Sequence, residues 1–175
     1  HNESFWRKYI FSTDHKIIGI QYGITALSFL LVGFTFMALM RWQLAYPEQP
    51  IPWKVFALVP MLVGVVVFFI GRRKGPYLSM AGFIFIGIGL LIWYFVLGET
   101  RMPEGVMLPE FYNSLGAMHG TIMVFLGIVP LSVGAFGNYV LPLQIGAPDM
   151  AFPKLNMASY WVFLLGGIMM LSSFF

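Results

Sequence analysis

The sequence contains no cysteine and very little charge. The absence of cysteine excludes a disulfide framework and any metal site built from thiolates. Charged residues make up 10% of the chain, whereas soluble domains carry about 25%. No basic run exceeds three residues, so the small positive excess does not indicate nucleic-acid binding. What remains is apolar: 59% of the residues are hydrophobic and the mean hydropathy is +0.81, which indicates that lipid surrounds the chain.

Five apolar segments are predicted to be helices that cross a membrane: residues 17–40, 55–70, 77–98, 111–133 and 157–175. A helix needs about 20 apolar residues to cross the hydrocarbon core, and it satisfies its own backbone groups there. The second segment is short and contains Pro60. The glycines and prolines of residues 136–153 predict a structured loop with tight turns. The expected fold class is therefore all-α, an integral membrane protein with a bundle of about five transmembrane helices.

The basic residues predict how these helices are oriented. The positive-inside rule favours a cytoplasmic N-terminus, because this orientation places seven Lys and Arg residues inside and three outside. The inner set is Arg7, Lys8, Lys16, Arg72, Arg73, Lys74 and Lys154, and the outer set is Arg41, Lys54 and Arg101. The first residue is not Met and the last lies within an apolar segment. We therefore expect a multi-pass fragment of a longer chain.

His119 is the first candidate for a functional residue. An ionisable side chain inside a membrane segment is costly and often functional. Gly116, Ala117 and Gly120 leave room beside the imidazole, and Tyr112 and Met123 share its helix face. A flat macrocycle could lie against that face with His119 as an axial ligand. A hydrogen bond to a neighbouring helix is an equally good interpretation of the spacing alone.

Arg41 closes the first apolar segment. It shares a helix face with Leu30, Phe34 and Met37. The apolar members of this face could pack against a ring, and the arginine could donate to a polar substituent of that ring. The alternative is an interfacial arginine whose charged end reaches water.

Asp149 lies in the predicted inner loop, and Asn138 and Asn156 flank it. A carboxylate in this place could collect protons, and the two amides could order water. The alternatives are ordinary: an aspartate after a proline often caps a helix, and asparagines favour turns.

These segments together resemble subunit I of the heme–copper oxidases. One block of similarity is Ser12, Thr13, Asp14, His15 and Lys16, followed by Gly19. The second runs from Tyr112 to Trp161 and includes residues 137–138, 142–143, 145–153 and Asn156. The second block is long and specific, so it is the stronger sign of the family.

The resemblance implies a role for each matching residue. His119 matches an axial ligand of the low-spin heme, of the heme A type. Arg41 matches the arginine that contacts the formyl group of heme A, and Tyr112 matches a tyrosine near that heme. Asp149 matches the acid at the mouth of a proton-uptake channel. Asn138 and Asn156 match two asparagines that constrict this channel.

The chain also departs from the family pattern. Residues 1–175 are expected to be the N-terminal part of one subunit I membrane domain, in which residues 55–98 form an inserted helical hairpin after the first span. Gln43 stands where many members have a glutamate at a structural cation site. Val32 and Phe36 replace the arginine and aspartate of quinol-oxidising relatives, and residues 147–150 read as in cytochrome c oxidases. These differences favour cytochrome c as the electron donor.

The implied activity belongs to the complete protein, a proton-pumping cytochrome c oxidase of the respiratory chain, and the fragment alone is not expected to be active. The high-spin heme and the copper would have their ligands beyond residue 175. The implied partners are subunits II and III, cytochrome c and membrane lipid, without nucleic acid, in the inner membrane of a bacterium. Two alternatives stay open: a quinol oxidase of the same superfamily, and a non-enzymatic multi-span transporter or scaffold.

Overall fold

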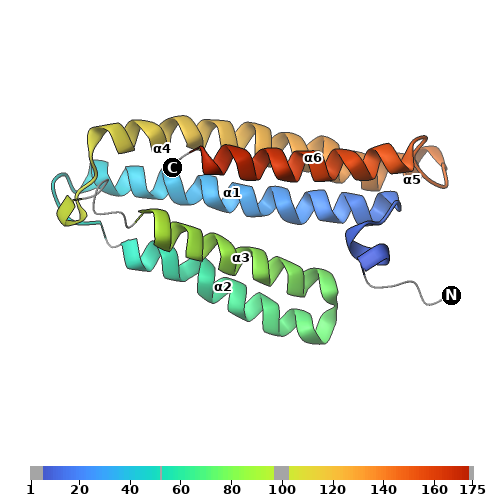
Figure 1. The fold of residues 1–175 in the computed structure, drawn as a ribbon, viewed down its shortest axis with the longest axis horizontal. Helices are drawn as coiled ribbons and strands as arrows, with labels where there is room; N and C mark the ends of the chain where they lie inside the picture. The colour runs from blue at the N-terminus through green and yellow to red at the C-terminus, as the bar shows by residue number, and fades with distance from the viewer. Residues whose placement is uncertain (1–5, 52, 97–102, 174–175) are drawn as a thin grey trace. The chain divides into compact units, whose positions relative to one another are not determined.

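The computed structural model describes residues 6–51, 53–96 and 103–173, and these residues form helices and connecting loops without a strand (Figure 1). The long helices are α1 (His15–Ala45), α2 (Trp53–Lys74), α3 (Pro76–Val96) and α6 (Pro153–Ser172). A further continuous helix, Pro109–Ile145, consists of α4 (Pro109–Thr121), η3 (Ile122–Ile128), η4 (Pro130–Gly137) and α5 (Asn138–Ile145). Short helices η1 (Trp6–Ile10) and η2 (Pro103–Gly105) precede α1 and α4. The expected all-α fold class is confirmed.

Three of these helices are long and apolar enough to cross a membrane: His15–Ala45, Pro109–Ile145 and Pro153–Ser172. Among the described residues, α3 also contains a shorter apolar stretch, Leu78–Gly87. Helices α2 and α3 have 22 and 21 residues, or roughly 30 Å each at 1.5 Å per residue. Their length suits a span, and membrane crossing by this pair stays a prediction. Arg101 and residues 97–98, used in the sequence predictions, lie outside the described residues.

The chain divides into two compact units, which we describe separately. Unit 1 joins the chain up to Phe29 with Val124–Phe175. Its buried cluster contains Ile18 and Tyr22 from α1, Ala135 from η4 and Tyr160 from α6. The Tyr22 ring stands edge-on to the Tyr160 ring, with centroids 5.2 Å apart. An added Cβ at Gly134 would lie 2.5 Å from the Tyr22 ring, so the glycine allows η4 to approach α1.

Unit 2 is Leu30–Met123 and contains the second half of α1, the hairpin of α2 and α3, and α4. The contacts of α1 with α4 and the start of η3 run in opposite directions along the two helices. Gly33 faces Met123, and Gly116 faces Met40, so the two helices are antiparallel here. Leu39 and Leu115 are fully buried in this unit.

Helices α2 and α3 form a helical hairpin joined by a single residue, Gly75. Gly75 has φ +150°, a backbone conformation that only glycine adopts readily. Pro76 then begins α3 with its fixed φ, at the position where a missing N–H is tolerated. The predicted hairpin is therefore present, with bounds 53–74 and 76–96. Its status as an insertion relative to the family stays a prediction.

The predicted loop at residues 136–153 is wrong over its first ten residues. The helix continues through Gly137 and Pro142 to Ile145, and the loop comprises only residues 146–152. Pro142 has no N–H for the carbonyl of Asn138, four residues earlier. The His15 ring reaches that carbonyl instead, with Nδ1 2.8 Å from the oxygen. A neighbouring helix thus supplies the donor that the proline lacks, which is how proline is tolerated inside helices in lipid.

Candidate functional site

His119 lies on α4 in unit 2, half-buried, with one ring nitrogen bound to the backbone of α1. Its Nδ1 is 2.8 Å from the carbonyl oxygen of Gly33. A carbonyl oxygen only accepts, so Nδ1 must carry the hydrogen. In the neutral ring the lone pair is then on Nε2. The contact therefore fixes the ring orientation and leaves Nε2 as the nitrogen that can coordinate a metal.

Gly33 also lies against Met123, a second residue of the long helix. A Cβ at Gly33 would lie 2.7 Å from the Met123 sulfur, so α1 and the long helix approach closely at this point. The structure thus brings His119 and Met123 to the same stretch of α1. The hydrogen bond to a neighbouring helix, one of the two interpretations of His119, does exist. Because it uses only Nδ1, it is compatible with a ligand role for Nε2.

The α1 face predicted to pack against a ring is open. On α1, Phe34 is 64% exposed, Arg41 is exposed, and Leu30 and Met37 are half-buried. Tyr112, on α4, is also half-buried. Arg41 stands eight residues beyond Gly33, about 12 Å along the helix axis. An oriented imidazole and exposed apolar side chains in one unit suit a flat apolar macrocycle with polar substituents. The residues present therefore fit a low-spin heme.

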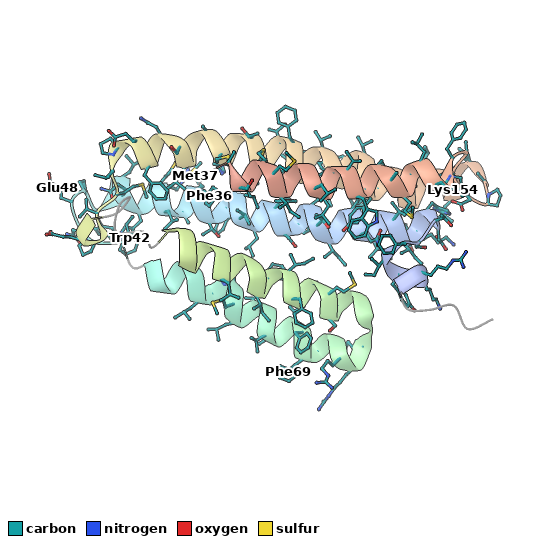
Figure 2. All side chains as sticks on the ribbon, in the orientation of Figure 1. Phe36, Met37, Trp42, Glu48, Phe69 and Lys154 are labelled. Carbon is teal, nitrogen blue, oxygen red and sulfur yellow. The ribbon has the colours of Figure 1, made fainter. Side chains whose placement is uncertain are left out.

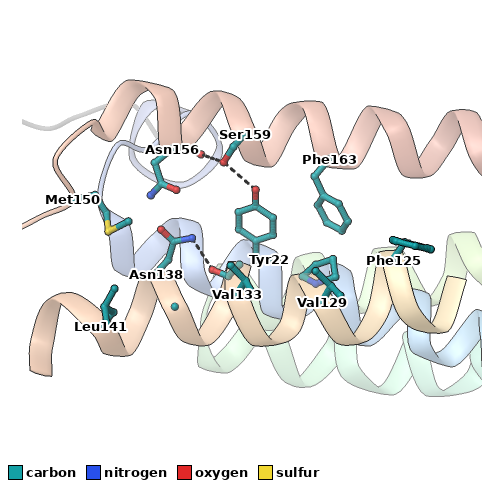
Figure 3. A pocket seen from close by; sticks show the side chains of 13 residues that line it. Tyr22, Phe125, Val129, Val133, Asn138, Leu141, Met150, Asn156, Ser159 and Phe163 are labelled. Atoms are coloured by element: carbon teal, nitrogen blue, oxygen red, sulfur yellow. Dashed lines mark hydrogen bonds between the residues drawn. The ribbon is translucent and has the colours of Figure 1, made fainter. Parts of the chain in front are cut away.

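A pocket of about 510 Å³ in unit 1 brings Asn138 and Asn156 together. Figure 3 shows the two amide side chains facing each other, Asn138 from α5 and Asn156 from α6. Asn138 Nδ2 donates to the Gly134 carbonyl at 2.7 Å. Asn138 Oδ1 and Asn156 Nδ2 are buried and have no hydrogen-bond partner within the described chain. Buried polar atoms of this kind usually bind ordered water, and the pocket has room for several molecules.

Two hydroxyl groups extend the polar lining of this pocket. The Tyr22 hydroxyl lies 3.0 Å from Ser159 Oγ, and Ser159 Oγ donates to the Asn156 carbonyl at 2.6 Å (Figure 3). Neither Tyr22 nor Ser159 was predicted from the sequence. Ser159 stands three residues after Asn156, so helical spacing alone could have placed it on the same face.

Asp149 lies half-buried in the loop before α6. One of its oxygens, Oδ1, accepts a hydrogen bond from the Met150 N–H at 2.7 Å. The residue before α6 is Phe152, and no side chain caps this helix. Helix capping therefore does not explain Asp149. Its neighbour Met150 lines the pocket that contains both asparagines, so Asp149 is next in sequence to the pocket wall.

Long apolar helices and a span that contains an oriented histidine define a polytopic helical membrane protein. The chain belongs to the family described as "Cytochrome C and Quinol oxidase polypeptide I", whose model matches residues 17–175. It is 34% identical over its full length to cytochrome c oxidase subunit 1 of Synechocystis sp., of which it covers 22%. It is 32% identical over 98% of its length to cytochrome c oxidase subunit 1 of Cereibacter sphaeroides, of which it covers 25%.

A third relative is the alternative cytochrome c oxidase subunit 1 of Bradyrhizobium diazoefficiens. It is 32% identical over the whole of this chain, and the chain covers 20% of its length. The chain thus spans about a fifth to a quarter of the length of these curated relatives. No solved structure matched. Among the described residues, no group of three His, Cys, Asp or Glu side chains could hold a metal ion.

Proposed function

We propose that the chain is the N-terminal part of the catalytic subunit of a terminal respiratory oxidase. The complete protein would pass electrons from cytochrome c through a low-spin heme to a heme–copper centre, reduce dioxygen to water and pump protons. The observation that carries this proposal is the bond from His119 Nδ1 to the Gly33 carbonyl. It supports the proposal because it holds the ring in one orientation and leaves Nε2 available as a ligand, in a family that uses heme and copper.

His119 holds the low-spin heme in this proposal, and the bound heme supplies one-electron transfer. The Gly33 carbonyl makes the imidazole a stronger ligand by accepting its Nδ1 hydrogen. Phe34, Met37, Tyr112 and Met123 would provide apolar and aromatic contacts to the bound heme. The second axial ligand, the high-spin heme ligand and the copper ligands would come from beyond residue 175.

Arg41 acts as a fixed positive charge near the edge of the heme. Its guanidinium would donate to the formyl group that distinguishes heme A. A positive charge in a medium of low dielectric constant favours the reduced, more negative state of a redox centre, so Arg41 raises the reduction potential. Its exposure in this structure leaves the donor groups free for such a partner.

Asp149, Asn138 and Asn156 form the start of a proton-uptake path. Asp149 takes protons from the cytoplasm, and water held between the two amides carries them inward. The unpaired Asn138 Oδ1 and Asn156 Nδ2 support this role because one accepts and the other donates to water. The hydroxyls of Tyr22 and Ser159 continue the path along the pocket wall.

Cytochrome c is the proposed electron donor, and oxidation of a quinol is the alternative. Val32 and Phe36 are 5% and 7% exposed, so both pack inside unit 2. They replace the two charged residues of quinol-oxidising relatives and offer no polar group to a quinol. We further propose that subunits II and III complete the enzyme in a bacterial inner membrane, with the N-terminus of this chain in the cytoplasm.

The test of this function is the visible spectrum of the complete, reduced oxidase with His119→Ala. The low-spin heme band should disappear while the high-spin heme band and the subunit composition remain. Thr121→Ala is the matched control, since this half-buried residue lies on the same helix and its hydroxyl bonds to the Ala117 carbonyl of its own helix. A low-spin band of wild-type position and size in His119→Ala refutes the ligand assignment. A wild-type protein without heme bands would favour a transporter or scaffold.

A further inference from the structure

The hairpin of α2 and α3 uses its small residues in its own helix contact. A Cβ at Gly64 would lie 2.7 Å from the Ile86 nitrogen. Added Cβ atoms at Gly71 and Gly82 would clash with the backbones of Ser79 and Phe68. Three glycines thus let the two backbones approach closely, which is how helices associate in lipid. They lie in this contact and are not available to a further protein partner.

The outer surface of the hairpin carries bulky apolar side chains. Phe69 is 61% exposed, and Figure 2 shows it on the outer side of α2, whereas Phe68 packs against Phe83 of α3. Exposed apolar residues follow α2 from Leu58 to Ile70 and continue on α3: Leu58, Val59, Leu62, Val63, Val65, Val66, Phe69, Ile70, Leu78, Phe83 and Leu90. Protein contacts within a bilayer favour small or hydrogen-bonding residues. A surface of aliphatic and aromatic groups therefore suits acyl chains better.

The turn of the hairpin concentrates positive charge beside this apolar surface. Arg72, Arg73 and Lys74 form the last turn of α2, and all three are exposed. The sequence from 53 to 96 contains no aspartate or glutamate, so the hairpin itself offers these cations no carboxylate. Cations at a helix C-terminus interact favourably with the helix dipole, but that interaction leaves their outer side free for an anion.

We propose that the hairpin is a lipid-facing element whose basic turn binds the headgroups of anionic phospholipids. The acyl chains would lie along α2, and the phosphates would meet the three cations where α2 ends. Basic residues at the end of a membrane helix attract anionic lipid in this way. The proposal rests on charge and surface complementarity of the hairpin alone, so it stands or falls independently of the proposed heme and proton chemistry.

The experiment titrates phosphatidylglycerol, with phosphatidylcholine for comparison, into the complete detergent-solubilised oxidase and counts bound lipids by native mass spectrometry. The triple variant Arg72→Gln, Arg73→Gln and Lys74→Gln should lower the affinity for phosphatidylglycerol by roughly tenfold or more, with phosphatidylcholine binding unchanged. Should the triple variant fail to assemble, the single variant Arg73→Gln should still lower the affinity several-fold.

The matched control removes three cations elsewhere, with Lys8→Gln, Lys16→Gln and Lys154→Gln, and should change the affinity by less than about twofold. Equal losses in the two triple variants would mean that only net charge matters and would overturn the proposal. Unchanged phosphatidylglycerol binding would also overturn it, as would full competition by inorganic phosphate. Loss of a companion subunit with lipid binding intact would identify the turn as a protein contact instead.

Discussion

At the scale of single residues, the contact between His15 and Asn138 shows how the two sequence blocks of the family depend on each other. His15 is only 3% exposed, and its ring nitrogen donates to the carbonyl that Pro142 leaves without a helical partner. Asn138 also lines the pocket of the proposed proton path. His15 is therefore expected to hold the backbone of Asn138 in place.

This arrangement predicts that a substitution at Pro142 rescues a substitution at His15. His15→Leu leaves the Asn138 carbonyl buried and unpaired, at a cost of about 1–3 kcal/mol. In the background of Pro142→Ala, the new N–H of residue 142 can pair with that carbonyl. The same His15→Leu change should then cost at least about 1 kcal/mol less. Thermal unfolding of the complete complex with both single variants and the double variant measures this coupling.

Simple additivity of the two losses would contradict the idea that His15 replaces the missing N–H of Pro142. The comparison has a second readout, because rescue of stability should be accompanied by rescue of the proton-uptake rate if Asn138 lies in the path. Recovery of stability without recovery of uptake would leave the contact established and count against the proposed role of Asn138.

The sequence indicated some site residues and missed others for a physical reason. His119 and Asp149 stand out because an ionisable group is rare in or beside an apolar helix. Tyr22 and Ser159 do not stand out, since tyrosine and serine are ordinary in membrane helices. Their partnership spans 137 positions in the sequence. It follows from the packing of α1 against α6, which local patterns do not predict.

At the scale of elements, the apolar segments predicted which parts are helical better than where the helices end. The end of α2 at Lys74 agrees with its basic last turn and with Gly75. The end of α5 does not follow from the sequence in the same way. Gly137 and Pro142 usually interrupt helices, but here the helix runs through both. The π-type helix η4 includes Gly137, and His15 supplies the donor that Pro142 lacks. The actual stop is Gly146, in the left-handed conformation with φ +71°.

The close contact within the hairpin predicts different effects for two glycine substitutions. Gly71→Ala places a methyl group against the backbone of Ser79, so the two helices must separate. We expect a loss of about 1–3 kcal/mol in stability. Gly87→Ala is the matched control in α3, because a Cβ there has no neighbour within 4 Å among the described residues. It should be neutral or stabilise the helix by up to about 1 kcal/mol.

The shift in the thermal unfolding midpoint of the complete complex measures both variants. Equal effects of the two substitutions would show that the hairpin is not held by this glycine contact. A loss for Gly71→Ala that also removes bound phosphatidylglycerol would connect hairpin packing with the lipid surface.

At the scale of the whole molecule, the two proposed tasks fall in different compact units. The residues assigned to the heme, from Phe34 to Met123, all belong to unit 2. The residues assigned to the proton path belong to unit 1, namely Tyr22, Asn138, Asp149, Asn156 and Ser159. This separation was not predicted from the sequence, because α1 and the helix Pro109–Ile145 each contribute to both units. It implies that the proton path can be damaged while heme binding remains intact.

Asp149→Asn in the complete oxidase tests this implication. The amide keeps the shape and can still accept from the Met150 N–H, but it cannot take up and release a proton at neutral pH. Turnover and proton pumping should fall by about tenfold or more, while the low-spin heme spectrum stays that of the wild type.

Glu110→Gln is the control. It removes an exposed carboxylate from the first turn of α4, at the start of the helix Pro109–Ile145, whereas Asp149 follows the end of that helix. Wild-type turnover and pumping in Asp149→Asn would exclude Asp149 from the path. Loss of the heme spectrum would show that the two units are not functionally separate, because a change confined to unit 1 would then have disturbed the ligand in unit 2.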